Sequence, residues 1–128
     1  MRILVVDDQV DAADTLAELL RCQGHAVEVA YSPADALQHA LARAPDVAFI
    51  DLVMPGMDGW QLAQAMRDRE PRSYLVALTG FGEDDRREKS KEAGLDMHLV
   101  KPIDPDRLEL VLSRAAHILA TRVPTAVA

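Results

Sequence analysis

The stretch VAFIDLVMPGMDGW, residues 47–60, joins a short apolar run to a Pro- and Gly-containing loop through one acidic residue, Asp51. A continuous apolar run of four residues is typical of a strand that helices cover on both faces. Residues 3–6 and 74–78 show the same pattern. We therefore predict three central strands of a parallel sheet, with Asp51 at the end of one of them.

Two weaker strand patterns complete the predicted sheet. Residues 26–30 alternate between apolar and polar side chains, and residues 97–100 form a brief run that includes His98. Both patterns are typical of less protected, outer strands. Helical spacing of apolar residues occurs in four places: residues 12–20, 33–44 and 60–69 lie between predicted strands, and residues 108–119 follow the last one. Ser32 and Pro33 are predicted as the N-cap and first residue of the second of these helices.

A fifth helical segment, residues 83–94, has Ala93 as almost its only apolar side chain. It offers little surface to bury against a sheet, so we expect it to be loosely held. Two interpretations stay open. The segment is either an ordinary solvated surface helix or an element that shifts when the protein changes state.

Strict alternation of strands and helices predicts an α/β fold, a single doubly wound, five-stranded parallel sheet with helices on both faces. A chain of 128 residues with 49% apolar content is suited to one core. We expect one domain over residues 1–122 and a short C-terminal tail over residues 123–128.

Composition excludes several classes of protein. The net charge of −7 and the lack of a basic stripe argue against direct nucleic-acid binding. No apolar run approaches the length of a membrane span, so we expect no membrane insertion and a cytoplasmic location. The single cysteine, Cys22, is expected to be a semi-buried helix residue without a role.

Polar residues with functional chemistry follow four of the predicted strands. Asp7 and Asp8 follow the first strand, Asp51 the third, Thr79 the fourth and Lys101 the fifth. Each has an ordinary explanation when taken alone, as a loop, cap or solvated residue. Together they favour a functional site, because the carboxyl ends of parallel strands meet at one edge of the sheet.

Three converging carboxylates require a cation. Two like charges about 4 Å apart repel by roughly 4 kcal/mol at an effective dielectric constant near 20. Carboxylate oxygens are ligands for Mg²⁺ or Mn²⁺, and the chain has no Cys/His set spaced for zinc. The predicted cofactor is Mg²⁺, with Mn²⁺ as a possible substitute.

Four motifs, in order and spacing, resemble the receiver domains of bacterial two-component response regulators: LVVDDQVDAADTL, FIDLVMPGMDGWQL, ALTGFG and AGLDMHLVKP. The resemblance covers residues 2–120 and is greatest to receivers of hybrid sensor kinases or single-domain relays. It implies the flavodoxin-like strand order 2-1-3-4-5. That order would place the first and third strands side by side and bring Asp7, Asp8 and Asp51 together.

The resemblance also implies a role for each acidic residue. Asp51 would be the phosphoacceptor, attacking a phosphohistidine to form an aspartyl phosphate. Asp8, Asp51 and the backbone carbonyl of Val53 would bind Mg²⁺ directly, and Asp7 would reach it through water.

The phosphate would in turn be bound by the Thr79 hydroxyl and the Lys101 ammonium. The Lys101–Pro102 peptide bond is implied to be cis. His98 stands where many family members carry a switching Tyr or Phe, so a switch role and an ordinary surface position both stay open. Phosphorylation would draw Thr79 and the loop after it toward the phosphate and alter the face around the fourth and fifth helices.

The implied partners are a sensor histidine kinase or histidine phosphotransfer protein as donor, and a downstream protein target. The protein would not be an enzyme beyond catalysing its own phosphorylation and dephosphorylation. Leu110 lies nearly opposite the apolar stripe of the last helix, next to the face that the family uses for partners. Partner contact and a chance exposed leucine both stay open for it.

Two other classes fit the sequence less well. A Mg²⁺-dependent phosphohydrolase with an aspartyl nucleophile usually has a second Asp two residues after the first, where this chain has Val53. A flavin-binding module needs a Ser/Thr/Gly-rich phosphate loop after the first strand, where this chain is acidic.

Overall fold

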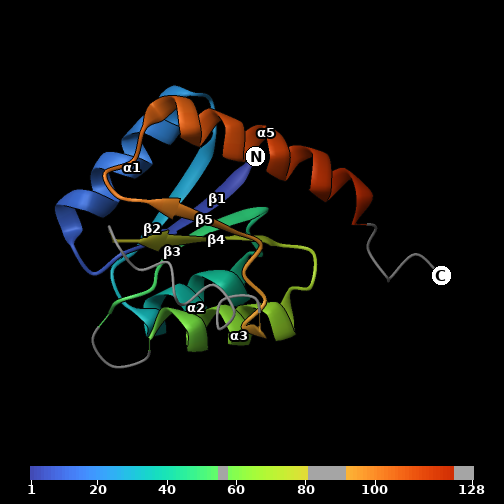
Figure 1. Ribbon diagram of the computed structural model, residues 1–128. Helices are drawn as coiled ribbons and strands as arrows, with labels where there is room; N and C mark the ends of the chain where they lie inside the picture. Colours follow the sequence, from blue (N-terminus) through green and yellow to red (C-terminus); the bar gives the residue numbers. More distant parts are fainter. Residues whose placement is uncertain (55–57, 81–91, 123–128) are drawn as a thin grey trace.

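The computed structural model describes residues 1–54, 58–80 and 92–122. Its five strands form one parallel sheet in the order β2-β1-β3-β4-β5 (Figure 1). The strands are β1 (Arg2–Val6), β2 (Ala26–Ala30), β3 (Val47–Asp51), β4 (Tyr74–Thr79) and β5 (Met97–Val100). The predicted fold class and strand order are confirmed, and the two strands predicted as outer ones, β2 and β5, lie at the edges.

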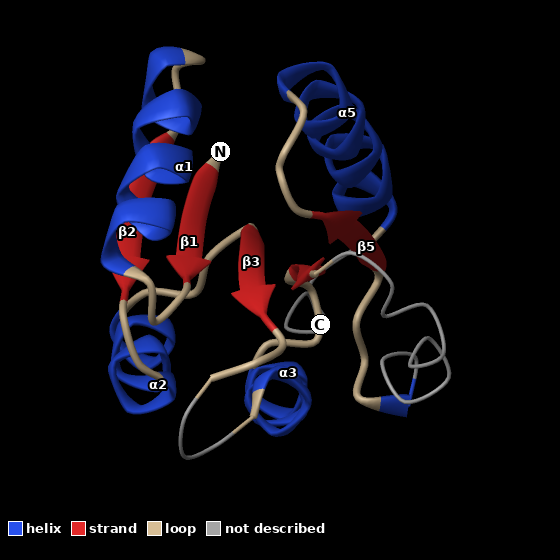
Figure 2. Cartoon of the chain, turned by 60° about the vertical axis from the view of Figure 1, so that its left-hand side comes forward, coloured by secondary structure: helices blue, strands red, loops and turns tan. Residues whose placement is uncertain are grey.

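Helices cover both faces of the sheet. They are α1 (Val10–Cys22), α2 (Pro33–Ala42), α3 (Gly59–Arg69) and α5 (Pro105–Thr121). Figures 1 and 2 show α1 and α5 on one face and α2 and α3 on the other. Among the described residues, no helix has the length and apolar character needed to cross a bilayer. The segment predicted as a helix at residues 83–94 lies outside the described residues except for its last three, and the predicted tail at residues 123–128 lies outside them entirely.

The sheet separates two apolar cores. Successive side chains of a strand point to opposite faces, so in β3 Phe49 packs toward α1 and α5 while Ile50 packs toward α2 and α3. All five residues of β3 are buried. Complete burial of one such side chain contributes about 1.5–3 kcal/mol. This two-sided burial is why the central strands are continuous apolar runs.

Helix starts follow local capping chemistry. The Ser32 hydroxyl accepts a hydrogen bond from the Asp35 N–H at 3.1 Å, which confirms the predicted cap of α2. Asp58 forms a reciprocal capping box with Gln61 at the start of α3, which the sequence analysis did not identify. These caps fix where the loops end and the helices begin.

Cys22 corrects one expectation. Its side chain is exposed, not semi-buried. The buried face of α1 includes Leu20, and a residue two positions later lies on nearly the opposite side of a helix with 3.6 residues per turn.

Candidate functional site

The carboxyl ends of four adjacent strands form one edge of the sheet. The strand register sets Val6 beside Ile50, so Asp7 and Asp51 come next on neighbouring strands. Asp51 pairs with Leu78, and the following residue, Thr79, pairs with Val100. Residues from four distant parts of the sequence therefore meet where the strands end.

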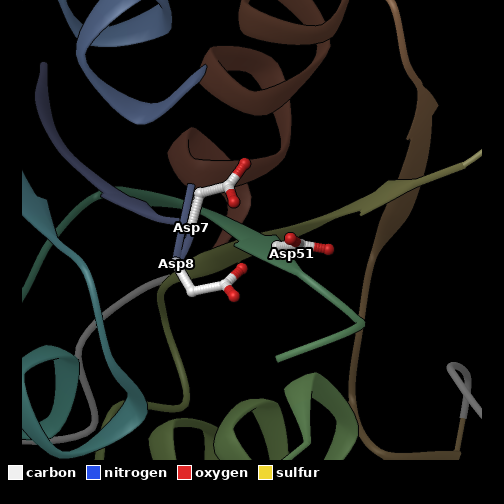
Figure 3. Close-up of side chains that lie close together, drawn as sticks. All are labelled: Asp7, Asp8 and Asp51. Carbon is white, nitrogen blue, oxygen red and sulfur yellow. The ribbon is translucent and has the colours of Figure 1, made fainter. Parts of the chain in front are cut away.

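Three carboxylates gather at this edge. One oxygen from each of Asp7, Asp8 and Asp51 lies within 4.8 Å of the other two. Figure 3 shows Asp7 and Asp8 on consecutive positions after β1, with Asp51 at the end of neighbouring β3. Asp7 is 1% exposed and Asp51 8%, whereas Asp8 is exposed to solvent. The cluster therefore has two buried members and one at its mouth.

Lys101 supplies positive charge to this cluster. Its Nζ lies 2.8 Å from Asp7 Oδ2 and 3.5 Å from Asp51 Oδ2. The Lys101 N–H donates to the Thr79 carbonyl at 2.8 Å, and the Lys101–Pro102 bond is cis, as the resemblance implied. In the part of the chain that the structure describes, Lys101 is the only side-chain cation paired with these carboxylates, so three negative charges share one positive charge.

Backbone N–H groups orient the two buried carboxylates. The Gln9 N–H donates to Asp7 Oδ1 at 3.0 Å, and the Val53 N–H donates to Asp51 Oδ1 at 3.1 Å. Both donors lie two residues after the acid that they bind. Gln9 was not a predicted site residue, because a backbone donor is independent of side-chain type and leaves no signal in the sequence.

Gly59 allows α3 to begin against the site. A Cβ atom at this position would lie 2.4 Å from the Asp51 carbonyl oxygen and 2.5 Å from Leu52 Cα, both backbone atoms. Only glycine fits so close an approach. Met54, in the loop between β3 and α3, is buried. Pro55, Gly56 and Met57 lie outside the described residues.

Burial dominates the electrostatics of Asp51. Loss of solvent raises its pKa, the Val53 N–H lowers it, the Asp7 carboxylate raises it and the Lys101 ammonium lowers it, with a net value of about 6. Burial alone would lower the pKa of Lys101, but its hydrogen bond to Asp7 and the charge of Asp51 outweigh this and raise it. The lysine therefore stays charged, while Asp51 is held in an unfavourable ionised state at neutral pH.

The donor set fits a hard divalent cation. Three carboxylates offset by one ammonium leave an excess of two negative charges, and oxygen ligands of this kind suit Mg²⁺-like ions. The acidic cluster of Asp7, Asp8 and Asp51 could thus bind a metal. The exposed position of Asp8 gives such an ion a route from solvent.

The remaining predicted residues lie at different places. Thr79 is buried at the end of β4, and no hydrogen bond among the described residues joins its hydroxyl to the three carboxylates. His98 lies on β5, where it lines a groove against α5 rather than the acidic cluster. The structure thus brings together the acids and Lys101, and places His98 elsewhere.

Comparison with known proteins gives a consistent result. The family model described as the response regulator receiver domain matches residues 3–113. Sporulation initiation phosphotransferase F of Bacillus subtilis is 32% identical over 107 residues, which are 84% of this chain and 86% of that protein. Regulatory protein AtoC of Escherichia coli is 31% identical over 117 residues, which are 91% of this chain but only 25% of AtoC.

Solved structures agree in fold. The receiver domain of NtrX from Brucella abortus superposes with a TM-score of 0.84 at 33% identity, covering 90% of this chain and 98% of that one. A CheY-like response regulator receiver domain protein from Methanospirillum hungatei superposes with a TM-score of 0.87 at 26% identity, covering 94% and 98%.

Proposed function

Because the chain belongs to the family of response regulator receiver domains of two-component systems, we propose that Asp51 is its phosphoacceptor. The observation that carries this proposal is the meeting of Asp7, Asp8, Asp51 and Lys101 at one edge of the sheet. The donor is a phosphohistidine on a sensor histidine kinase or a histidine phosphotransfer protein.

In the proposed transfer, an oxygen of the Asp51 carboxylate forms a bond to phosphorus while the bond from phosphorus to the histidine nitrogen breaks. The electron pair of that bond stays on the imidazole, which leaves. Phosphoryl transfer depends on positioning and charge neutralisation more than on covalent help from the protein. The Val53 N–H positions Asp51 for this attack.

Asp8, Asp51 and the Val53 carbonyl would hold Mg²⁺, or Mn²⁺ in its place, and Asp7 would reach the ion through water. When bound, the ion supplies positive charge that neutralises the phosphoryl oxygens. Lys101 Nζ lies 3.5 Å from Asp51 Oδ2 and would neutralise the same oxygens. The two cations together would offset the mutual repulsion of the three carboxylates.

Thr79 would couple phosphorylation of Asp51 to a change in the rest of the domain. It ends β4, one residue after the partner of Asp51 in the sheet, and its hydroxyl would turn to donate to a phosphate oxygen. The loop after it would follow and alter the face around α5 and the segment before β5. His98 stays an open candidate for a coupled switch residue, since it lies on β5 opposite Ala77 of β4.

A groove beside the site would receive the donor. It has a volume of about 420 Å³ between α1 and the loop after β5, and Leu16, Leu19 and Ile103 give it a mostly apolar lining. Asp7 and Lys101 form its inner wall. An apolar surface next to the donor's phosphohistidine would rest here while the phosphoryl group reaches Asp51.

We do not favour a phosphohydrolase. The family match covers residues 3–113, and Val53 occupies the position where such enzymes carry their second aspartate. The catalytic activity proposed is limited to the domain's own phosphorylation and dephosphorylation. The downstream partner is a protein, and the predicted cytoplasmic location stays a prediction.

The decisive experiment is phosphorylation by acetyl phosphate with and without Mg²⁺, read by intact-protein mass spectrometry. Wild type is expected to gain one phosphoryl group only with Mg²⁺, and Asp51→Asn none. Asp68→Asn, on the exposed surface of α3, is the matched control and should behave as wild type. A phosphoryl group that persists in Asp51→Asn would refute the assignment, and rapid turnover of many phosphate esters would favour a hydrolase.

A further inference from the structure

A groove of about 630 Å³ borders the edge of the sheet at β2. Among the described strands, β2 pairs only with β1, and Figure 2 shows α1 beside it. We propose that this groove binds a basic, extended segment of a partner protein, which adds to the sheet along β2 and sets its cationic side chains against α1. The surface lies apart from the phosphorylation site, and the proposal does not depend on the phosphoacceptor assignment.

The backbone of β2 directs hydrogen-bonding groups to this edge. The Ala30 carbonyl accepts from the Asp7 N–H at 3.1 Å, so the backbone groups of Ala30 point toward β1. These directions alternate along a strand, so the backbone groups of Val27 and Val29 point away from β1. Backbone groups left without a partner at a sheet edge are a template for pairing with another chain.

Val29 is the position on β2 that is open to a partner. The Arg21 guanidinium donates to the Val27 carbonyl at 2.9 Å, which blocks the edge at that point. Within the described ranges, neither the N–H nor the C=O of Val29 forms a hydrogen bond at the edge. Val29 also lines the groove. The edge is therefore covered near its start and open near its end, where the groove lies.

The wall of the groove formed by α1 is acidic. Asp14 and Glu18 line it, and in the part of the chain that the structure describes neither forms an ion pair. Tyr31, 40% exposed, lines the groove too, and its hydroxyl donates to Asp14 Oδ1 at 2.5 Å. An exposed tyrosine ring can contact a cation as well. On a chain of net charge −7, such a wall selects and steers a basic partner.

The geometry fits an extended segment. Asp14, Glu18 and Cys22 line the groove at intervals of four residues and so share one face of α1. This face extends about 12 Å at 1.5 Å per residue, a length that about four residues of a strand span at 3.3 Å each. Alternate side chains of an added strand would point to the α1 side. A segment with basic residues at every second position would therefore pair with Val29 and meet the two acids.

A second copy of the chain fits the β2 edge less well than a basic partner. In a two-fold symmetric contact the same patch faces itself. Asp14 and Glu18 would then approach their own symmetry mates. Like charges brought together in this way oppose association.

The groove at β2 and the groove proposed for the phosphodonor lie on different flanks of α1. Thr15, Leu16 and Leu19 face the donor groove, whereas Asp14 and Glu18 face the groove at β2. The two grooves share no lining residue. A partner bound at β2 would therefore leave the donor groove accessible, which suits a protein that stays attached while the phosphoryl group is transferred.

The test is a fluorescence anisotropy titration with three labelled peptides of equal length. The first alternates arginine and valine, the second has glutamate in place of arginine, and the third keeps the arginines but has proline in place of valine. Wild type should bind the first peptide, more weakly as salt increases, and the glutamate peptide at least about 10-fold more weakly. The proline peptide keeps the charge but loses backbone donors, so it should bind about 5-fold more weakly than the first.

Two groove variants and two matched controls locate the binding surface. Asp14→Lys and Glu18→Lys should each weaken binding of the arginine–valine peptide by about 10-fold or more. Asp68→Lys on α3 and Glu109→Lys on α5 change the net charge equally at exposed positions elsewhere. These controls should change binding by less than about 2-fold at physiological salt, and circular dichroism checks that all four variants are folded.

Cys22 gives a second way to block the groove. It is the only cysteine of the chain, and it is exposed in the groove wall. Attachment of a polyethylene glycol maleimide to Cys22 should abolish binding of the arginine–valine peptide. In the matched control, Cys22→Ser with Gln64→Cys on exposed α3 carries the same label and should bind as unlabelled wild type does.

Equal binding of the arginine and glutamate peptides, or equal losses in groove and control variants, would overturn the proposal. A proline peptide that binds as tightly as the arginine–valine peptide would overturn the addition of a strand at β2. So would a dimer in analytical ultracentrifugation that Glu18→Lys converts to monomer, because a second copy would then occupy the edge.

Discussion

The two ends of the sheet contain ionic clusters that differ in their balance of charge. At the amino-terminal end of β4 and β5, one carboxylate, Asp96, is surrounded by donors: Arg67 at 2.6 Å, Arg122 at 2.5 Å and the Leu75 N–H at 2.8 Å. At the carboxyl-terminal end, three carboxylates share Lys101. The first cluster has its charges satisfied and ties elements together. The second keeps an excess of negative charge, which is costly for folding but suited to binding a cation and a phosphoryl group.

The largest change in the free energy of unfolding is expected from Asp96→Asn. The change leaves two partly buried guanidinium groups without their counter-charge, and breaking such a pair from one side should lower the free energy of unfolding by about 2–4 kcal/mol. Urea denaturation measures it, with Asp68→Asn as an exposed control expected to stay within about 0.5 kcal/mol. A loss no larger than the control's would show that the Asp96 cluster is not a stabilising contact.

Mg²⁺ should stabilise the folded state through the cluster of Asp7, Asp8 and Asp51, and not through the Asp96 cluster. An ion that binds the folded state alone stabilises by about 2.7 kcal/mol at 100 times its dissociation constant. In thermal melts, wild type and Asp96→Asn should both unfold at a higher temperature in Mg²⁺ than in EDTA. The unfolding temperature of Asp8→Asn should increase much less on addition of Mg²⁺. An equal gain in Asp8→Asn would place the ion outside the acidic cluster.

Asp51→Asn should change the free energy of unfolding in the opposite direction to Asp96→Asn. It removes one of three crowded carboxylates while the amide oxygen can still accept from the Val53 N–H. In EDTA at pH 7 the variant should therefore be more stable than wild type, by roughly 1–2 kcal/mol. Urea denaturation provides the measurement. A destabilised variant would mean that the ion pair between Asp51 and Lys101 stabilises the folded state more than burial of the Asp51 charge destabilises it.

The smallest expected effect is in the pH profile. The folded state raises the pKa of Asp51 from 3.8 to about 6, so it binds a proton more tightly than the unfolded state does. Stability from this group is therefore present below pH 4 and is lost as pH rises to about 6, with a slope of at most about 1.4 kcal/mol per pH unit. In EDTA, the difference between wild type and Asp51→Asn should shrink from pH 7 toward pH 4. A constant difference across this range would contradict the raised pKa.

Local patterns predicted most of the fold. The apolar runs at residues 47–50 and 74–78 gave central strands, because burial on both faces requires apolar side chains at every position. Ser32 predicted a helix start, because its cap forms with a residue three positions away. Cys22 was placed wrongly because its small size was weighed and its position was not: it lies two residues after the buried Leu20 and so on nearly the opposite side of the helix.

The site was predictable in its residue types but not in its contacts. Strand ends identified Asp7, Asp51 and Lys101, since parallel strands end at one edge. The ion pair between Lys101 and Asp7 spans 94 positions, and no periodicity relates residues so far apart. The same holds for Arg67 and Asp96, 29 positions apart, whose cluster the sequence analysis did not foresee.

The sequence by itself determined which segments become strands and helices and which acids stand at the strand ends, because these depend on side-chain hydrophobicity and on neighbours a few residues away. Only the tertiary structure decided that Asp96 is fully paired while Asp51 is crowded. Both are aspartates beside a strand, and what distinguishes them is the number of opposite charges and donors that distant parts of the chain bring within about 3 Å.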